Sequence, residues 1–171
     1  MSEGHNVWQN RPGMIMHART LIALGTVALC AACASTPQAT PEPEAEAKRF
    51  EPVTREAVIY IYRPGVALSG PETTLWVDNR LVGASLPGTF FRVIALPGRN
   101  VIDTSPPDSG RIAITTRGND VTYVEMITEG GFTDSPKTRF RVVPDEQAKA
   151  TIARCCWMLE TWRHNQPRLV W

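Results

Sequence analysis

The stretch Ala57–Arg63, AVIYIYR, decides the fold of this chain. It is rich in β-branched and aromatic residues and is followed by the turn pair Pro64-Gly65, a combination typical of a β-strand. Its side chains are apolar on both faces of such a strand, whereas an edge or half-exposed strand would alternate between apolar and polar residues. We therefore predict that this stretch is a central strand of a sheet.

Further short runs of β-like sequence follow at intervals of roughly ten to fifteen residues and are separated by turn residues. Residues 73–78 alternate apolar and polar side chains, and Asn79-Arg80 then predicts a tight hairpin turn into residues 81–83. Other strands are expected at residues 89–96, 101–104, 111–116, 121–128 and 138–143. The predicted fold class is an all-β, antiparallel sandwich-like domain of about seven short strands.

One amphipathic helix is expected after the last strand. Pro144 suits the first helical position, and the two acidic residues that follow it complement the positive end of the helix dipole. An apolar stripe at helical spacing predicts that this helix packs on the sheet, and it consists of Ala148, Ile152, Cys155 and Leu159. The globular domain is thus expected over residues 57–159, with an irregular tail over 160–171.

An uncharged apolar run, LIALGTVALCAAC, occupies residues 21–33. Thirteen helical residues span roughly 20 Å, which is too short for a bilayer core of about 30 Å. The basic Arg19 before the run and the small residues Ala31 and Ala32 near its end are typical of a secretory signal. We expect a signal peptide over residues 1–32 that begins at Met1, Met14 or Met16. Residues 1–13 are then either not translated or an unusually long n-region.

The cysteine directly after this cleavage site resembles the lipobox of bacterial lipoproteins. The resemblance implies that Cys33 is lipidated and becomes the first residue of a membrane-anchored mature protein. Cys30 departs from the lipobox pattern, which usually has Leu there, and an ordinary cleaved signal that leaves Cys33 as a thiol is the alternative. Ala34 stands where Asp would favour retention in the inner membrane of enterobacteria, so the resemblance implies the outer membrane.

Residues 33–56 are rich in proline and glutamate and offer little to bury beyond Phe50. Such a segment gains too little from burial to offset the entropy of ordering it. We expect a disordered linker that holds the domain tens of ångströms from the membrane.

The net charge and the cysteine content limit which partners and which disulfides can be expected. The formal net charge is +1, so no basic field indicates nucleic-acid binding. Two of the four cysteines lie in the export region, and the adjacent Cys155 and Cys156 do not form a disulfide framework. We expect Cys155 to pack on the helix stripe and Cys156 to be partly exposed, because a disulfide between neighbours would strain a helix. The alternative is a redox or metal-binding thiol pair.

Catalytic arrangements are not evident in the predicted β-domain. The histidines are His5, His17 and His164, all outside it, so a His-dependent nucleophile or a zinc site is not expected there. Turn chemistry accounts for most acidic residues, which fall at strand ends. We predict no enzyme activity, no cofactor and no metal; the carboxylates considered were Asp78, Asp103, Asp108, Asp120, Glu125 and Glu129.

Aromatic side chains on the predicted strands are the candidate ligand-facing residues. Tyr60, Tyr62 and Trp76 could form a platform for a glycan or peptide, with Arg63 beside them. Packing within the core or on a sheet face is the alternative for these aromatics, and a solvated sheet face is the alternative for the arginine.

Several short motifs occur together at a characteristic spacing. They are Ile59-Tyr60-Ile61-Tyr62-Arg63-Pro64, Leu75-Trp76-Val77-Asp78-Asn79 with Val82-Gly83, Phe90-Phe91, and Leu96-Pro97-Gly98-Arg99-Asn100. In this respect residues 57–143 resemble the bacterial lipoprotein domain of unknown function 2846. Asn79 and Asn100 replace a usual Gly and a common His of that pattern. The resemblance implies an envelope location and a β-rich fold, and it brings no catalytic residue with it.

Taken together, the sequence predicts a non-enzymatic, membrane-tethered envelope lipoprotein that faces the periplasm and acts as a binding or structural module. The membrane is one expected partner, through the lipid, and an envelope protein or cell-wall polymer is the other. One alternative is a carboxylate-based hydrolase of envelope glycan that uses Glu125 or Asp78. Another is a small accessory subunit of an envelope complex that docks through Trp157, Trp162 and Trp171.

Overall fold

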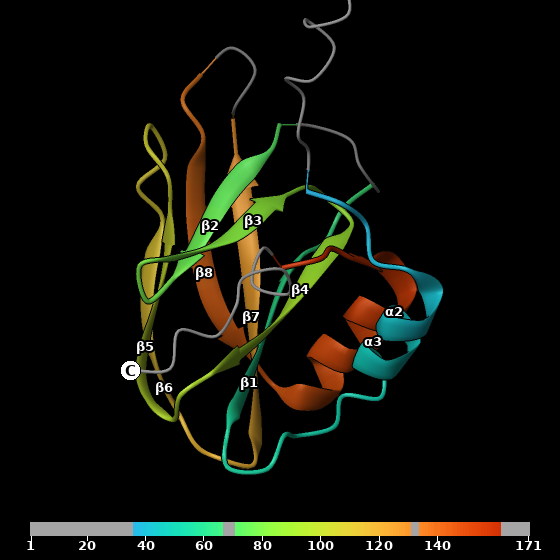
Figure 1. The fold of residues 1–171 in the computed structure, drawn as a ribbon. Coiled ribbons are helices and arrows are strands. Elements are labelled where there is room, and N and C mark those ends of the chain that lie inside the picture. Colours follow the sequence, from blue (N-terminus) through green and yellow to red (C-terminus); the bar gives the residue numbers. More distant parts are fainter. Residues whose placement is uncertain (1–35, 67–70, 131–133, 162–171) are drawn as a thin grey trace, which may run out of the picture. The chain divides into compact units, whose positions relative to one another are not determined.

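The computed structural model describes residues 36–66, 71–130 and 134–161 (Figure 1). Within these residues, nine strands form two sheets, with the orders β8-β7-β1-β4-β9 and β3-β2-β5-β6. The strands are β1 (Ala57–Arg63), β2 (Thr73–Val77), β3 (Arg80–Ser85), β4 (Thr89–Ala95), β5 (Gly98–Thr104), β6 (Arg111–Thr116), β7 (Asp120–Glu129), β8 (Lys137–Val143) and β9 (Trp157–Met158). The helices are α2 (Pro41–Ala47) and α3 (Asp145–Cys155), and neither is long and apolar enough to cross a membrane.

β1 lies at the centre of the five-stranded sheet, as its apolar sequence predicted. It pairs antiparallel with β4, where Ile61 lies opposite Phe91, and parallel with β7, where Tyr60 lies opposite Tyr123. The parallel pair requires a crossover, which here runs through the whole four-stranded sheet. The predicted all-β sandwich with a C-terminal helix is confirmed, and the pairs β1–β7 and β4–β9 add parallel pairing to an otherwise antiparallel arrangement.

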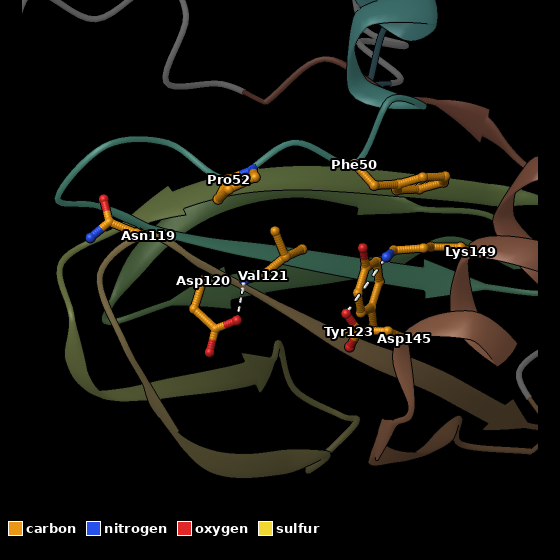
Figure 2. Close-up of a pocket in the computed structure, with 8 residues that line it drawn as sticks. All are labelled: Phe50, Pro52, Asn119, Asp120, Val121, Tyr123, Asp145 and Lys149. Carbon is orange, nitrogen blue, oxygen red and sulfur yellow. Dashed lines mark hydrogen bonds and ion pairs between the residues drawn. The ribbon is translucent and has the colours of Figure 1, made fainter.

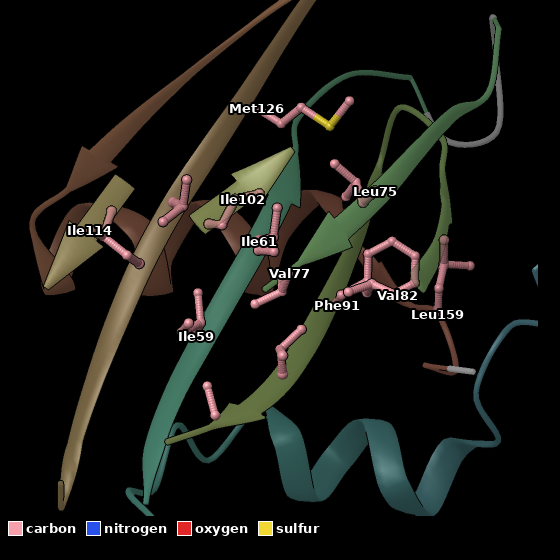
Figure 3. Close-up of a cluster of buried hydrophobic side chains, with 13 residues drawn as sticks. Ile59, Ile61, Leu75, Val77, Val82, Phe91, Ile102, Ile114, Met126 and Leu159 are labelled. Carbon is pink, nitrogen blue, oxygen red and sulfur yellow. The ribbon is translucent and has the colours of Figure 1, made fainter. Parts of the chain in front are cut away.

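The space between the two sheets holds the main hydrophobic core (Figure 3). Ile59 and Ile61 of β1 pack there with Leu75 of β2 and Ile102 of β5, and each of these side chains is at most 1% exposed. Burial of a side chain of this size contributes about 1.5–3 kcal/mol, so this layer is the main source of stability. Leu159, beyond β9, is part of the same core.

A second buried cluster covers the other face of the five-stranded sheet. Tyr60 and Tyr62 alternate with the inward residues of β1 and therefore point to this face. Ala148 and Ile152 of α3 and Ala47 of α2 pack in the same cluster. Figure 1 shows α2 and α3 side by side. β1 is thus covered on both sides, which explains why its sequence is apolar throughout.

The β2–β3 hairpin turns at Asp78 and Asn79, one residue earlier than predicted. Both residues have positive φ, 50° and 60°, as a two-residue type I′ turn requires. The Asp78 carboxylate accepts hydrogen bonds of 2.8 Å from the backbone N–H of Val101 and from the side-chain amide of Asn100. This carboxylate therefore joins the hairpin to β5.

The expectation of a disordered linker over residues 33–56 is wrong for the part that the structure describes. Pro41–Ala47 forms α2, in which Glu44 and Ala47 are buried. The Tyr60 hydroxyl donates a 2.6 Å hydrogen bond to the carbonyl of Ala47, and the Glu44 carboxylate accepts one of 3.2 Å from the N–H of Met158. The segment has few apolar residues, but Ala47, Phe50 and Val53 pack against the second buried cluster, and these hydrogen bonds to the domain add to that packing.

Residues 36–39 connect the two sheets at one open edge of the sandwich. Oγ1 of Thr36 accepts a 2.7 Å hydrogen bond from the N–H of Ala84 in β3, the edge strand of one sheet. The N–H of Ala39 donates a 2.9 Å hydrogen bond to the carbonyl of Met158 in β9, the edge strand of the other. The segment therefore pairs with backbone N–H and C=O groups that would otherwise lack hydrogen-bond partners at the sheet edges.

The predicted helix stripe is correct for Ala148 and Ile152 but wrong beyond Cys155, where α3 ends. Leu159 lies in the core between the sheets and not on the helix. The chain leaves the helical path because Trp157 pairs with β4, and its N–H donates a 2.9 Å hydrogen bond to the carbonyl of Gly88.

Cys155 and Cys156 form a disulfide, contrary to the expectation of two separate thiols. That expectation placed both residues in the helix, whereas Cys156 follows its last turn with extended backbone (φ −123°, ψ 134°). The predicted exposure is also reversed, because Cys156 is buried at 3% exposure and Cys155 is only half-buried.

Candidate functional site

Tyr60 and Tyr62, predicted to face a ligand, lie beneath the helices. They are 0% and 1% exposed, and the Tyr62 hydroxyl donates a 3.3 Å hydrogen bond to the Glu125 carboxylate. The ligand-facing prediction is therefore wrong for both residues, because α2 and α3 cover the face on which it placed them. The alternative of core packing is correct.

Trp76 and Arg63 lie apart from these tyrosines. Trp76 projects from the outer face of the four-stranded sheet, is half-buried, and donates a 2.7 Å hydrogen bond to Oγ of Ser105. Arg63 is 5% exposed and donates hydrogen bonds of 2.9 and 3.4 Å to the carbonyls of Pro71 and Ser85, while burial lowers the pKa of its guanidinium. The four predicted ligand-facing residues thus do not converge on one surface.

The carboxylates considered for hydrolysis all have structural partners. Asp108 is buried and accepts hydrogen bonds of 3.0 Å from the N–H groups of Gly110 and Thr138. Glu125 accepts bonds of 2.9 and 2.7 Å from the guanidinium of Arg141. Asp78 holds the hairpin described above, and the remaining pairs are Asp103 with Arg111, Asp120 with the N–H of Val121, and Glu129 with Arg139.

A pocket of about 210 Å³ lies beside the N-terminal end of α3 (Figure 2). It is formed by the chain that follows α2, the turn between β6 and β7, the start of β7, and the first turns of α3. Its lining residues are Phe50, Pro52, Asn119, Asp120, Val121, Tyr123, Asp145 and Lys149.

Tyr123 lines this pocket and has a buried hydroxyl. Its ring stacks on that of Tyr60 with centroids 5.3 Å apart and contacts the edge of Phe50 at 6.0 Å. The residue is 1% exposed, and its hydroxyl has no hydrogen-bond partner among the described residues. A buried hydroxyl without a partner costs about 1–3 kcal/mol, so a hydrogen bond from a ligand atom would stabilise this group.

Two opposite charges lie near the Tyr123 side chain. Nζ of Lys149 is 3.7 Å from a carboxylate oxygen of Asp145 and 6.0 Å from the centre of the Tyr123 ring (Figure 2). Burial, followed by the charge of Asp145, raises the pKa of Tyr123. The phenol therefore stays protonated at neutral pH and can both donate and accept a hydrogen bond.

The backbone at the rim of the pocket is unusual. Phe50 and Asn119 have positive φ values of 57° and 60°, which are rare for a bulky residue such as Phe. The N–H of Phe50 donates to the carbonyl of Ala47 and that of Asn119 to the carbonyl of Glu56, both at 2.9 Å. These hydrogen bonds hold both residues in this conformation, and both line the pocket.

The pocket therefore combines acceptors, donors and an apolar wall. Asp120 and Asp145 supply carboxylate oxygens, Lys149 supplies an ammonium group, and Phe50 supplies an aromatic ring. In the described part of the chain, no three His, Cys, Asp or Glu side chains are grouped closely enough to hold a metal ion. The arrangement is suited to hydrogen bonding with a small polar molecule.

No sequence pattern indicates this pocket as a unit. Asp120 was considered as a catalytic acid, but Phe50, Tyr123 and Lys149 were not considered as site residues. Their shared location depends on the docking of the segment after α2, which was expected to be disordered. A positive φ at Phe50 also has no signature in the sequence.

Three predicted functional residues lie outside the described residues: Cys33, Trp162 and Trp171. Trp157, the described member of the predicted docking patch, is 50% exposed.

Comparison with known proteins gives a distant relationship. No family model matches the chain, and no solved structure matches it. An uncharacterized protein of Haemophilus influenzae is 27% identical to it over 133 residues, which cover 77% of this chain and 79% of that protein. The aligned region covers most of both chains, and the name of the related protein states no function.

Proposed function

We propose that this protein is a membrane-tethered lipoprotein of the bacterial envelope that acts as a non-enzymatic binding module, with the pocket beside α3 as its binding site. The observation that carries the proposal is that Tyr123 lines the pocket while its buried hydroxyl has no partner among the described residues. Buried polar groups in proteins almost always have a partner, and a bound ligand would provide one.

The lining favours a saccharide residue as the ligand. Carboxylates and the neutral Tyr123 hydroxyl can accept and donate hydrogen bonds to sugar hydroxyls, while Phe50 and Pro52 offer an apolar surface to the C–H face of a ring. A volume of about 210 Å³ is below the range of roughly 300–1,000 Å³ that is typical for drug-sized ligands. The pocket therefore suits a single sugar ring at the end or in a branch of an envelope glycan.

The tether is supported by the sequence. The apolar run before Cys33 resembles a lipobox, and residues 57–143 resemble the bacterial lipoprotein domain of unknown function 2846. Ala34 after the cysteine favours the outer membrane in this proposal.

Ligand-observed NMR with monosaccharides and small oligosaccharides of envelope glycan tests the binding function. Tyr123→Phe removes only the unpartnered hydroxyl and should weaken binding about tenfold, since a buried hydrogen bond contributes about 1–1.5 kcal/mol. Lys137→Met, at the start of β8 and outside the pocket, serves as the control and should bind as the wild type does. Saccharide binding that is unaffected by Tyr123→Phe would contradict this site, and binding of simple amines in place of saccharides would contradict the ligand class.

The intact mass of membrane-extracted protein tests the tether. A mass that begins at Cys33 and includes acyl chains, and that is lost in Cys33→Ala, is the expected result. A soluble product without lipid would show that the protein is released into the periplasm, and it would remove the lipoprotein part of the proposal.

A further inference from the structure

We infer that the lipid anchor holds this domain directly against the membrane, with the sandwich edge that residues 36–39 cover next to the lipid headgroups. The inference rests on the proposed lipidation of Cys33. The tether is therefore much shorter than the disordered linker predicted from the composition of residues 33–56.

The chain is fixed to the domain from Thr36 onward. Thr36 is 8% exposed, and its hydroxyl accepts the 2.7 Å hydrogen bond from Ala84 described above. The carbonyl of Pro37 accepts a 2.9 Å hydrogen bond from the N–H of Glu160, and Gln38 forms a β-bridge with Leu159. Both sheets and the segment after α3 therefore hold this strand-like piece in place.

Little chain remains between the anchor and this point. Only Ala34 and Ser35 separate Cys33 from Thr36. An extended chain advances at most about 3.3–3.6 Å per residue, so the three steps from Cys33 to Thr36 span about 10–11 Å. The headgroup region on each side of a bilayer is about 5–8 Å thick, which is of similar size.

This distance fixes which part of the domain meets the membrane. Acyl chains on Cys33 place that residue at the boundary between hydrocarbon and headgroups, so the β3 and β9 edge can rise no more than about 10 Å from it. A flexible spacer would have allowed any orientation, whereas this tether permits contact with lipid through one edge only.

The proposed binding pocket lies away from that edge. Thr36 packs beside Gly83 and Phe91, and Phe91 lies opposite Ile61, near the end of β1. Asp120 of the pocket lies opposite Ala57, at the start of β1. Figure 1 shows the turn between β6 and β7 at the end of the sandwich opposite to the entry of residue 36. The short tether therefore directs the pocket away from the lipid surface.

Photocrosslinking in native membranes tests this orientation. The photoreactive residue p-benzoylphenylalanine is placed at Gln38 or, as the matched control, at Arg117 in the β6–β7 turn; both positions are exposed. Covalent adducts with phospholipid are then quantified by mass spectrometry. We expect several-fold more lipid adduct at Gln38→p-benzoylphenylalanine than at the Arg117 variant.

A length variant makes the test specific for the tether. An insertion of about 20 Gly and Ser residues after Ala34 gives a mean span of about 25 Å and should reduce the Gln38 adduct to the Arg117 level. Equal adducts at both positions in the native-length protein, with acylated Cys33 in the same sample, would overturn the inference but leave the proposed function intact. A sample without acylated Cys33 would overturn the inference together with the lipoprotein part of the proposed function.

Discussion

Tyr60 and Tyr123 stack on each other with ring centroids 5.3 Å apart, yet only the Tyr60 hydroxyl has a hydrogen-bond partner. Both side chains are at most 1% exposed and lie on neighbouring strands at the same level of the sheet. The two phenols therefore have the same chemistry and nearly the same packing, and they differ in whether the hydroxyl is paired. This difference allows a stability test with matched variants.

Tyr60→Phe should lower the free energy of unfolding by about 1 kcal/mol, because it removes the 2.6 Å hydrogen bond to the carbonyl of Ala47. Tyr123→Phe removes a buried hydroxyl without a partner and should leave stability unchanged or raise it by up to about 1 kcal/mol. Urea denaturation of both variants measures these changes. A loss of equal size in both would show that the Tyr123 hydroxyl is paired in solution.

Stability should decrease at alkaline pH because of the same tyrosines. Burial, followed by the charge of Glu125, raises the pKa of Tyr62 from 10.0 to about 12, and burial also raises the pKa of Tyr60 and Tyr123. The native state therefore keeps its phenolic protons at a pH where the unfolded chain has lost them. The resulting contribution to stability is complete below pH 10 and is lost as the pH rises from 10 to about 12.

Tyrosinate absorbance measured together with circular dichroism checks this pH dependence. The chain has three tyrosines, and all three belong to this group, so no tyrosine should ionise with an ordinary pKa while the protein is folded. We expect ionisation and unfolding to occur together. A tyrosine that titrates near pH 10 in the folded protein would contradict the burial described here.

Thr36→Val should lower the free energy of unfolding by about 1–3 kcal/mol, because the N–H of Ala84 then loses its acceptor at a covered sheet edge. Thr151→Val is the control, since the Thr151 hydroxyl bonds to the carbonyl of Gln147 in an exposed part of α3. That change should have an effect within about 0.5 kcal/mol. Chemical denaturation of the domain that begins at Ala34 measures the free energy of unfolding of both variants. If Thr36→Val leaves that free energy unchanged, residues 36–39 do not dock on the domain.

Two arginines on β8 offer a comparison between ion pairs. Arg141 donates two hydrogen bonds to Glu125, whose side chain is 11% exposed, whereas Arg139 pairs with Glu129, whose side chain is 64% exposed. Removing Arg141 leaves a largely buried carboxylate without its cation, so Arg141→Ala should destabilise the protein more than Arg139→Ala. Thermal unfolding at low and moderate salt measures both, and an equal effect would indicate that solvent screens Glu125.

The strand pattern could be predicted from local sequence because turn residues and side-chain alternation are local properties. The apolar run Ala57–Arg63 indicated a central strand, and Asn79 indicated the hairpin to within one residue. The parallel partner of β1 could not be predicted, because the pairing joins segments that are far apart in the sequence. β9 has only two residues, too few for alternation to be visible.

The candidate site was not predictable for a related reason. Glu44 and Phe50 lie in a Pro- and Glu-rich segment whose composition is typical of disorder, and their order comes from tertiary partners such as the N–H of Met158. For Tyr60 and Tyr62 the sequence allows both a ligand-facing surface and core packing, because alternation along a strand identifies two faces but does not reveal which face helices cover. The pocket exists only once these distant segments have docked.

The central place of β1 also determines the order in which the domain can assemble during synthesis. Translation completes β1 before either of its neighbours exists, and the second neighbour, β7, starts only at Asp120. Until then, the nascent chain carries a strand that is apolar on both faces and has open hydrogen-bonding groups on at least one edge. A holdase chaperone that binds this strand would therefore act before the sheet forms, and a truncated product that ends before Asp120 is an aggregation-prone peptide rather than a smaller working domain.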